Sequence, residues 1–286
     1  MSTLPPSVPH SSGRFTKQAH VNVPEGTFEE EHGRGGFFGK VSHLYHSNAP
    51  TGWSRIEGPL SPHAYDLNKV DASEMPKKFL ENNDCALWMY TPKKEMPSYY
   101  RNADGDDCWF IHKGEGLVET DFGPLKYRKG DYIVLPRGTT YRFFPSGKEN
   151  FYLLIEAASE YELPDRGQLG RQAFFDPGVL EIPKAEPSKT GPTGKGPDGK
   201  PEWEIKIKRE GTYTSFFYPY NPLDIEGWKG DLFSWKLNVE DIRPIVSARF
   251  HLPPSVHTTL VAKNFVICTF APRPMETGDP KAQRVP

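Results

Sequence analysis

The sequence predicts an all-β protein with a small antiparallel barrel at its centre. Proline and glycine are abundant, with 29 and 26 among 286 residues, and 13% of the residues are aromatic. This composition is typical of short strands joined by many turns. The clearest pattern lies between Asn102 and Phe144, where short β-rich runs alternate with Gly, Pro and Asp turns. Such closely spaced short strands favour a sandwich or jelly-roll barrel over a helical protein.

The predicted strands of this central region follow one another at short intervals. Each is rich in β-branched, aromatic or alternating apolar residues and ends at a Gly, Pro or Asp turn, which is the local signature of an antiparallel hairpin. The runs are Cys108–Ile111, Leu117–Thr120, Leu125–Arg128, Tyr132–Leu135 and Thr139–Phe144. They are the elements on which the all-β prediction chiefly depends.

Composition also predicts how the chain is divided. Residues 1–22 are expected to be disordered, and residues 184–202 carry almost no apolar side chains, so they are expected to form an exposed loop. The loop separates an N-terminal arm and barrel (23–183) from the start of a second barrel (203–286), which opens with the alternating run Trp203–Lys208. Short helical turns are expected at Gln168–Phe175 and Val239–Ile242.

Charge and cysteine content exclude several classes of function. The net charge of −2 and the pI of about 6.5 give no electrostatic basis for binding nucleic acid or an anionic membrane. No apolar run approaches the roughly 20 residues that a membrane helix needs. Cys85, Cys108 and Cys268 are widely spaced, which favours reduced thiols over disulfides or a metal site. We therefore expect a cytoplasmic protein.

The turn spacing after Lys129 resembles the second sequence motif of the cupin barrel. That motif places glycine, proline, glycine, histidine and asparagine at fixed intervals. Gly130, Pro136 and Gly138 match the spacing, whereas Tyr141 stands at the histidine position and Pro145 at the asparagine position. The barrel pattern is therefore kept without the histidine of this motif.

The first cupin motif is matched in the same incomplete way. Gly114 fits its closing glycine and Asp107 stands where glutamate is expected, but the two histidine positions fall near Tyr100–Ala103. No histidine lies between His63 and His112. Because a two-histidine, one-carboxylate iron site needs imidazole nitrogens that converge with a carboxylate, this barrel is predicted to hold no metal.

A wider set of segments resembles the homogentisate 1,2-dioxygenase family. The resemblance begins near residue 25, continues to the end of the chain and keeps the order of the family throughout. It rests on Phe28–Glu31, Gly36–Gly39, His43–His46, Pro50–Trp53, Arg101–Gly105, Glu119–Gly123, Gly130–Gly138, Tyr161–Asp165, Asn221–Asp224, Gly227–Gly230 and Phe250–Ser255.

This resemblance implies a two-barrel cupin whose N-terminal barrel is metal-free and whose C-terminal barrel holds Fe(II). It implies ring cleavage of homogentisate by O2 to maleylacetoacetate, in the breakdown of tyrosine and phenylalanine, by a homo-oligomer. The ferrous ion would bind the substrate and O2. His251 matches the acid–base histidine of the family, and a histidine pKa near 6.5 suits proton transfer at neutral pH.

In this family the iron ligands follow a segment like Phe265–Pro274, in a Tyr-His-x-Asn…Glu stretch and a later His-Pro…His-Gly stretch. The sequence ends at Pro286, near where the first stretch is expected. The second barrel is therefore expected to be partial, and the polypeptide as written is not expected to form the iron site or to be active alone.

Other histidines admit simpler interpretations. His251 and His257 could form a metal pair, but no carboxylate follows at a useful spacing, and a histidine bonded at a strand end is the ordinary alternative. His43 and His46 could line a pocket, although a packed N-terminal arm is the more usual explanation. The aromatic stripe Tyr213–Tyr220 fits a barrel wall or subunit contact better than a ligand pocket.

Three functional hypotheses follow from the sequence. The first is an iron-dependent ring-cleaving dioxygenase. The second is a non-catalytic cupin protein that binds a small aromatic acid or a partner subunit. The third is a cupin isomerase or sugar-binding protein, against which the missing histidines of the first barrel argue. Oxygen uptake with homogentisate and ferrous ion separates the first from the other two.

Overall fold

Two units make up the fold. The computed structural model describes residues 10–35, 38–246 and 252–272. The barrel unit comprises Tyr65–Arg243 and Thr258–Ala271, and the hairpin unit comprises Met1–Ala64, Pro244–His257 and Pro272–Pro286.

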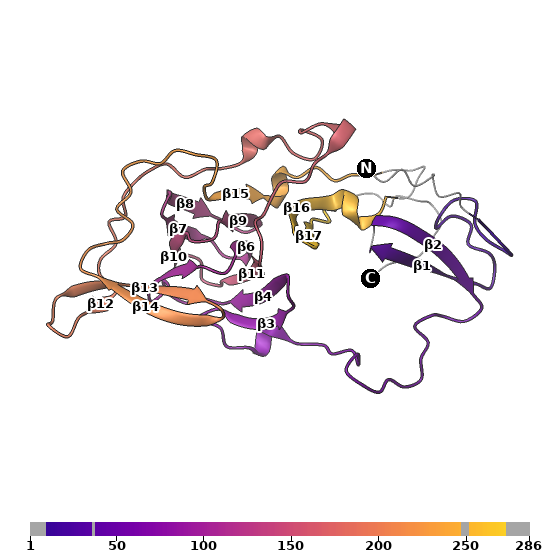
Figure 1. Cartoon of the computed structure of the whole chain (residues 1–286), viewed down its shortest axis with the longest axis horizontal. Helices are drawn as coiled ribbons and strands as arrows, with labels where there is room; N and C mark the ends of the chain where they lie inside the picture. Colours follow the sequence, from indigo (N-terminus) through magenta and orange to yellow (C-terminus); the bar gives the residue numbers. More distant parts are fainter. Residues whose placement is uncertain (1–9, 36–37, 247–251, 273–286) are drawn as a thin grey trace. The chain divides into compact units, whose positions relative to one another are not determined.

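The barrel unit is built from two facing sheets, whose strands are stacked in Figure 1. The first sheet has the order β12-β13-β5-β10-β7-β8, with β14 paired to β13, and the second has the order β15-β9-β6-β11-β4-β3. The strands are β3 (Lys77–Glu81), β4 (Cys85–Tyr90), β5 (Tyr99–Asn102), β6 (Asp106–Lys113), β7 (Gly116–Thr120), β8 (Gly123–Tyr127), β9 (Asp131–Leu135), β10 (Thr140–Pro145), β11 (Phe151–Ala157), β12 (Gly194–Lys195), β13 (Pro201–Arg209), β14 (Thr212–Tyr218) and β15 (Trp235–Asn238). The all-β prediction is confirmed, and every predicted strand is present.

The core between the two sheets is aromatic. Side chains that alternate along the inner strands point into it, as the period of two in a strand requires. Trp109, Ile133, Phe143 and Tyr152 are fully buried there, with relative exposures of 0%. Rings of this size fill a barrel of this width completely. The interior is therefore a packed core.

The second sheet is buried on its outer face as well. Cys108, Tyr132 and Val134 point away from the barrel core and pack against Leu260 and Ile267. These last two belong to an antiparallel pair, β16 (Thr258–Ala262) and β17 (Phe265–Cys268). Burial on both faces explains why all five residues of β9 are buried.

Two glycines of the matched motif have the backbone conformation that makes glycine necessary. Gly130 and Gly138 both have φ of +89°, in the left-handed region that side chains disfavour. At Gly130 an added Cβ would also meet Cγ2 of Val239 at 2.9 Å. The spacing of the motif glycines therefore matches the two turns that flank β9.

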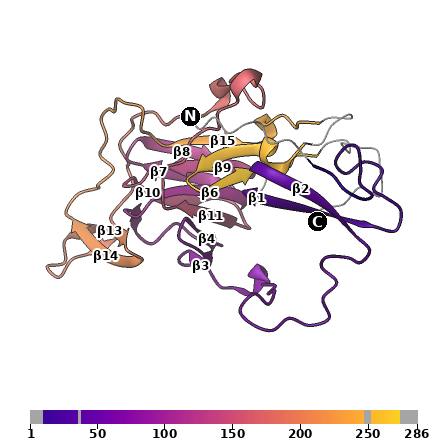
Figure 2. The same cartoon turned by 45° about the vertical axis from the view of Figure 1, so that its right-hand side comes forward.

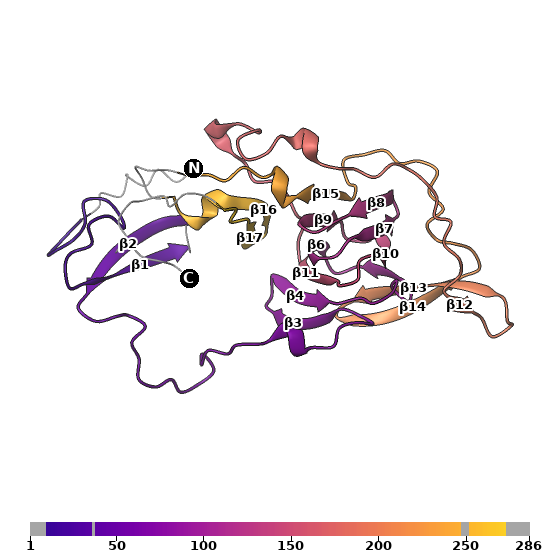
Figure 3. The same ribbon diagram turned by 180° about the vertical axis from the view of Figure 1, so that it is seen from behind.

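The segment after residue 202 joins the barrel. β13 pairs in parallel with β5, and β15 pairs antiparallel with β9; Figure 3 shows β13 and β14 beside the other barrel strands. The barrel unit therefore runs across the predicted division at 184–202. That stretch is largely exposed, and it is fastened where the Ser188 hydroxyl donates to the Glu119 carboxylate at 2.6 Å.

The hairpin unit contains β1 (Phe28–Gly35) and β2 (Phe38–His46), an antiparallel pair visible in Figure 2. Residues 1–9 lie outside the described residues, but part of the stretch 10–22 has defined contacts: the Thr16 hydroxyl hydrogen-bonds the Tyr45 hydroxyl at 2.6 Å. The 3-10 turn η5 (Pro254–His257) also belongs to this unit.

Helical structure is limited to short 3-10 turns in the described residues. In the barrel unit these are η1 (Leu67–Lys69), η2 (Gly167–Leu169), η3 (Pro177–Val179) and η4 (Val239–Asp241). The expected turns at Gln168–Phe175 and Val239–Ile242 are thus confirmed in part of each range. No helix among the described residues has the length and apolar character needed to cross a membrane.

Candidate functional site

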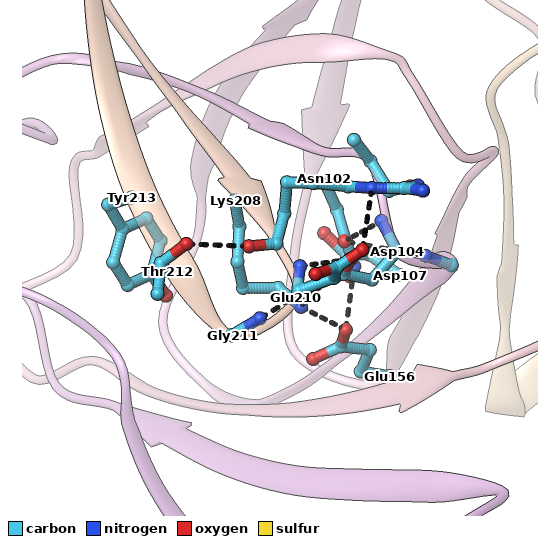
Figure 4. Close-up of polar contacts among 12 residues, drawn as sticks. Asn102, Asp104, Asp107, Glu156, Lys208, Glu210, Gly211, Thr212 and Tyr213 are labelled. Atoms are coloured by element: carbon cyan, nitrogen blue, oxygen red, sulfur yellow. Dashed lines mark hydrogen bonds and ion pairs between the residues drawn. The ribbon is translucent and has the colours of Figure 1, made fainter.

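The two positions where a cupin would place metal ligands are joined to each other in this barrel. Asp107 on β6 and Tyr141 on β10 are both at most 1% exposed. The Tyr141 hydroxyl donates to Oδ2 of Asp107 at 2.7 Å, and Nδ2 of Asn102 donates to Oδ1 at 2.8 Å. Both carboxylate oxygens are therefore engaged by neutral donors, as Figure 4 shows for Asn102 and Asp107.

Aromatic rings fill the space around this pair. The ring of Tyr100, near the predicted histidine positions, lies 5.4 Å from the ring of Tyr141 between centroids. Trp109 lies 6.3 Å from Tyr141 on another side. The Tyr100 hydroxyl is itself hydrogen-bonded to the hydroxyl of Tyr213 at 2.9 Å. Bulky rings thus stand where imidazole ligands would be needed.

A buried charged network lies beside Asp107. Lys208 on β13 is 4% exposed, and its ammonium contacts Oδ2 of Asp104 at 2.7 Å and Oε1 of Glu156. Nδ2 of Asn102 also donates to Oε1 of Glu156, at 3.1 Å, so it links the two carboxylates (Figure 4). Trp88 donates to the second oxygen of Glu156 at 3.0 Å.

Burial and charge shift the pKa values in this network in opposite directions. Burial raises the pKa of Asp107 to about 7, and the nearby Glu156 carboxylate adds to the effect. Burial acts in the same sense on Asp104, but Lys208 and the amides of Glu210 and Gly211 outweigh it and lower the pKa of that carboxyl. Burial would lower the pKa of Lys208, yet its bonds to Asp104 and Glu156 raise it.

One hollow of the barrel unit is small. It lies beside Glu119, is lined by Leu117, Pro187 and Leu223 among others, and has a volume of about 120 Å³. Pockets that hold small molecules are usually about 300–1,000 Å³. This hollow is therefore smaller than the pockets that usually hold small molecules.

The two units differ in where their histidines lie. Within Tyr65–Arg243 the sequence has one histidine, His112, and it is exposed at the end of β6. The predicted acid–base residue, His251, lies outside the described residues, so its pairing with His257 cannot be placed. In the hairpin unit, His43 lies within metal-binding reach of His20 and Glu31.

Sequence reasoning missed two of these groupings. The salt bridges of Lys208 join β13 to Asp104 and Glu156, which precede it in the sequence by 104 and 52 positions. His20 lies in a stretch predicted to be disordered, and it approaches Glu31 only in the folded hairpin unit. The opposition of Glu31 and His43 comes from the register of β1 and β2, which the sequence did not reveal.

Two facing, mostly antiparallel sheets that enclose one aromatic core define the class of the barrel unit as a cupin-type double-stranded β-helix. A solved cupin-2 domain protein from Shewanella frigidimarina is similar over 32% of this chain and 87% of that chain, with 18% identity and a TM-score of 0.28. The family model described as homogentisate 1,2-dioxygenase N-terminal matches residues 54–239. The chain belongs to this family.

Curated relatives agree with that assignment. A Saccharolobus solfataricus protein with the provisional name of a dioxygenase is 32% identical over 92% of this chain and 72% of its own length. The homogentisate 1,2-dioxygenases of Bradyrhizobium diazoefficiens and Mus musculus are each 26% identical. They match 59% and 64% of this chain, and the match spans 36% and 40% of those proteins.

Proposed function

We propose that this chain supplies the metal-free barrel of a dioxygenase that uses Fe(II) and O2 to cleave the aromatic ring of homogentisate. Family membership and the names of the relatives support the reaction class. The observation that carries the barrel's role is the bond from Tyr141 to Asp107, which occupies the cupin metal position with a neutral donor. The barrel is then a scaffold beside the chemistry.

The barrel residues do not fit an iron site. Asp107 is the carboxylate at the metal position, and both of its oxygens already accept hydrogen bonds. No imidazole accompanies it, because the one histidine of Tyr65–Arg243 is the exposed His112. We therefore assign no step of the reaction to a metal in this barrel, and we propose that a second barrel holds the iron, as the resemblance implies.

His251 remains our proposed acid–base residue. In the proposed reaction both atoms of O2 enter the product, and a base accepts a phenolic proton of the substrate as the ring is attacked. Positioned general bases typically contribute about 10²–10⁴-fold to rate. Replacing His251 with Gln should then lower kcat within that range while substrate binding, measured as Kd, changes less.

The experiment is oxygen uptake, with homogentisate and added ferrous ion, by this chain extended with the C-terminal iron-binding barrel that the resemblance implies. Uptake that depends on homogentisate, with two ¹⁸O atoms from ¹⁸O2 in the ring-opened product, supports the proposal. A folded protein that binds homogentisate but consumes no O2 favours instead a non-catalytic protein for a small aromatic acid. Cytoplasmic location and homo-oligomerisation belong to the same proposal, and sedimentation measures the oligomer.

A further inference from the structure

The β1–β2 hairpin places acidic and imidazole side chains on one face. Glu31 is directly opposite His43, and Glu29 is directly opposite Tyr45. Because side chains alternate between the two faces of a strand, these four share a face. Directly opposed side chains in an antiparallel pair are close enough to interact, so the register itself brings a carboxylate to an imidazole.

A third group reaches the same face from the preceding loop. Nε2 of His20 lies 3.6 Å from Oε2 of Glu31, and Nε2 of His43 lies 3.4 Å from the same oxygen. The rings of His20 and His43 meet edge to face, with centroids 5.2 Å apart. One ligand atom from each of the three residues lies within 4.8 Å of the others.

These separations are those of ligands around one metal ion. With metal–ligand bonds of about 2.1 Å, neighbouring donor atoms are about 3.4 Å apart in a tetrahedral site and about 3.0 Å apart in an octahedral one. The two measured nitrogen–oxygen distances, 3.4 and 3.6 Å, are close to the tetrahedral value.

A second layer of contacts orients His20. Its other ring nitrogen, Nδ1, is hydrogen-bonded to Oε1 of Glu29, whose side chain is 4% exposed. Glu29 also accepts a hydrogen bond from the Tyr45 hydroxyl at 2.8 Å. A carboxylate behind a ligating histidine fixes the ring orientation and the tautomer in metalloproteins. The arrangement thus has both layers of a metal site.

We propose that His20, Glu31 and His43 bind a divalent metal ion of the Zn²⁺ class. A dication offsets the negative charges of Glu29 and Glu31, whose ion-pair partners among the described residues are histidines. Two imidazoles and one carboxylate leave a fourth position for water. The ion would tie the loop before residue 22 to the hairpin. This site is independent of the proposed ring-cleavage function.

The opposite face of the hairpin offers a matched control. There His46 pairs with Glu30 at 3.0 Å between Nε2 and Oε2, also within β1 and β2. No third ligand group accompanies this pair among the described residues. A lone histidine–carboxylate pair should bind a divalent ion much more weakly than three converging ligands.

The test is metal binding by the chelator-treated full chain. We expect Zn²⁺ titration by calorimetry to give a tight site, and Co²⁺ at that site to give the intense visible absorption of tetrahedral coordination. Glu31→Gln and His43→Gln should each abolish that site, and Glu29→Gln should weaken it about 10–100-fold. His46→Gln should leave it unchanged.

Circular dichroism keeps the outcome interpretable, because Glu31→Gln changes one atom of the carboxylate and should preserve the strands. The proposal is overturned if wild type and folded Glu31→Gln bind Zn²⁺ equally. It is also overturned if His46→Gln reduces binding as much as His43→Gln does, since the ion would then be held by any surface histidine.

Discussion

Asp107 in the barrel and Glu31 in the hairpin unit are carboxylates with opposite surroundings. Asp107 is fully buried, and neutral donors from Asn102 and Tyr141 hold both of its oxygens. Glu31 is partly exposed and faces two imidazole nitrogens at 3.4 and 3.6 Å. A carboxylate whose oxygens already accept hydrogen bonds from neutral donors has no free oxygen to bind a cation. A carboxylate that faces two histidine nitrogens can bind a metal ion together with them. The comparison supports our proposal of a metal site at Glu31 and of none at Asp107.

The largest effect is expected from Lys208→Met. This change removes the cation from a buried site and leaves Glu156 and Asp104 without their partner, which should cost about 3–5 kcal/mol of unfolding free energy. Urea denaturation measures the loss. Lys206→Met, at a half-buried position of the same strand, should change stability by less than about 1 kcal/mol. Equal losses in the two variants would contradict a buried charged network.

The pH dependence of stability should reveal Asp107. Its pKa is about 7 in the folded protein and about 4 when unfolded, so folding favours the protonated form. The contribution of Asp107 to stability is therefore complete below about pH 4, is lost as pH rises to about 7, and then stays constant; a shift of this size corresponds to roughly 4 kcal/mol.

Asp107→Asn keeps the shape of the side chain and removes its titration. We expect the difference in unfolding free energy between wild type and this variant to change steadily from pH 4 to pH 7 and to be constant above. A difference that does not vary across that interval would show that Asp107 titrates normally.

A smaller effect is expected from Tyr141→Phe. The change removes one donor from a fully buried carboxylate, which should cost about 1–3 kcal/mol. Since the Tyr141 bond lowers the pKa of Asp107, that pKa should rise further and extend the pH-dependent interval upward. Tyr213→Phe removes a hydrogen bond to the neutral Tyr100, so it should leave the pH dependence of the unfolding free energy unchanged. Denaturation at several pH values distinguishes the two variants.

The smallest effect on stability is expected from Tyr45→Phe, the same change made in the hairpin unit. The Tyr45 hydroxyl supports Glu29, which in turn orients His20. In the absence of metal the loss should be about 1 kcal/mol or less, whereas Zn²⁺ affinity should fall about 10-fold. An unchanged affinity would mean that Glu29 does not orient a ligand.

Local sequence was informative wherever the interaction is short in range. The turns at Gly130 and Gly138 were predicted because a left-handed backbone conformation strongly prefers glycine. The strands between them were predicted because alternation and β-branching act on neighbouring residues. The absence of histidine at the metal positions was readable for the same reason, since motif spacing within a hairpin is local.

The long-range contacts were not predicted. β13 was assigned to a second barrel, yet it pairs in parallel with β5, about 106 residues earlier by the register of Ile207 and Arg101. Nothing local specifies such a partner, because an edge strand offers the same backbone groups to many others. The role of His20 was missed likewise, since a polar stretch before a hairpin carries no sign of the face on which it will lie.

The sequence by itself determined the strands, the turns and the absence of histidine from the barrel's motif positions, because each depends on residues a few positions apart. Only the tertiary structure decided which side chains meet at those positions. Asp107 and Tyr141 are 34 residues apart, and their bond exists because β6 and β10 face each other across one core. Only folding, too, brought His20, Glu31 and His43 together, because convergence of ligand atoms requires the hairpin register and the returning loop at once.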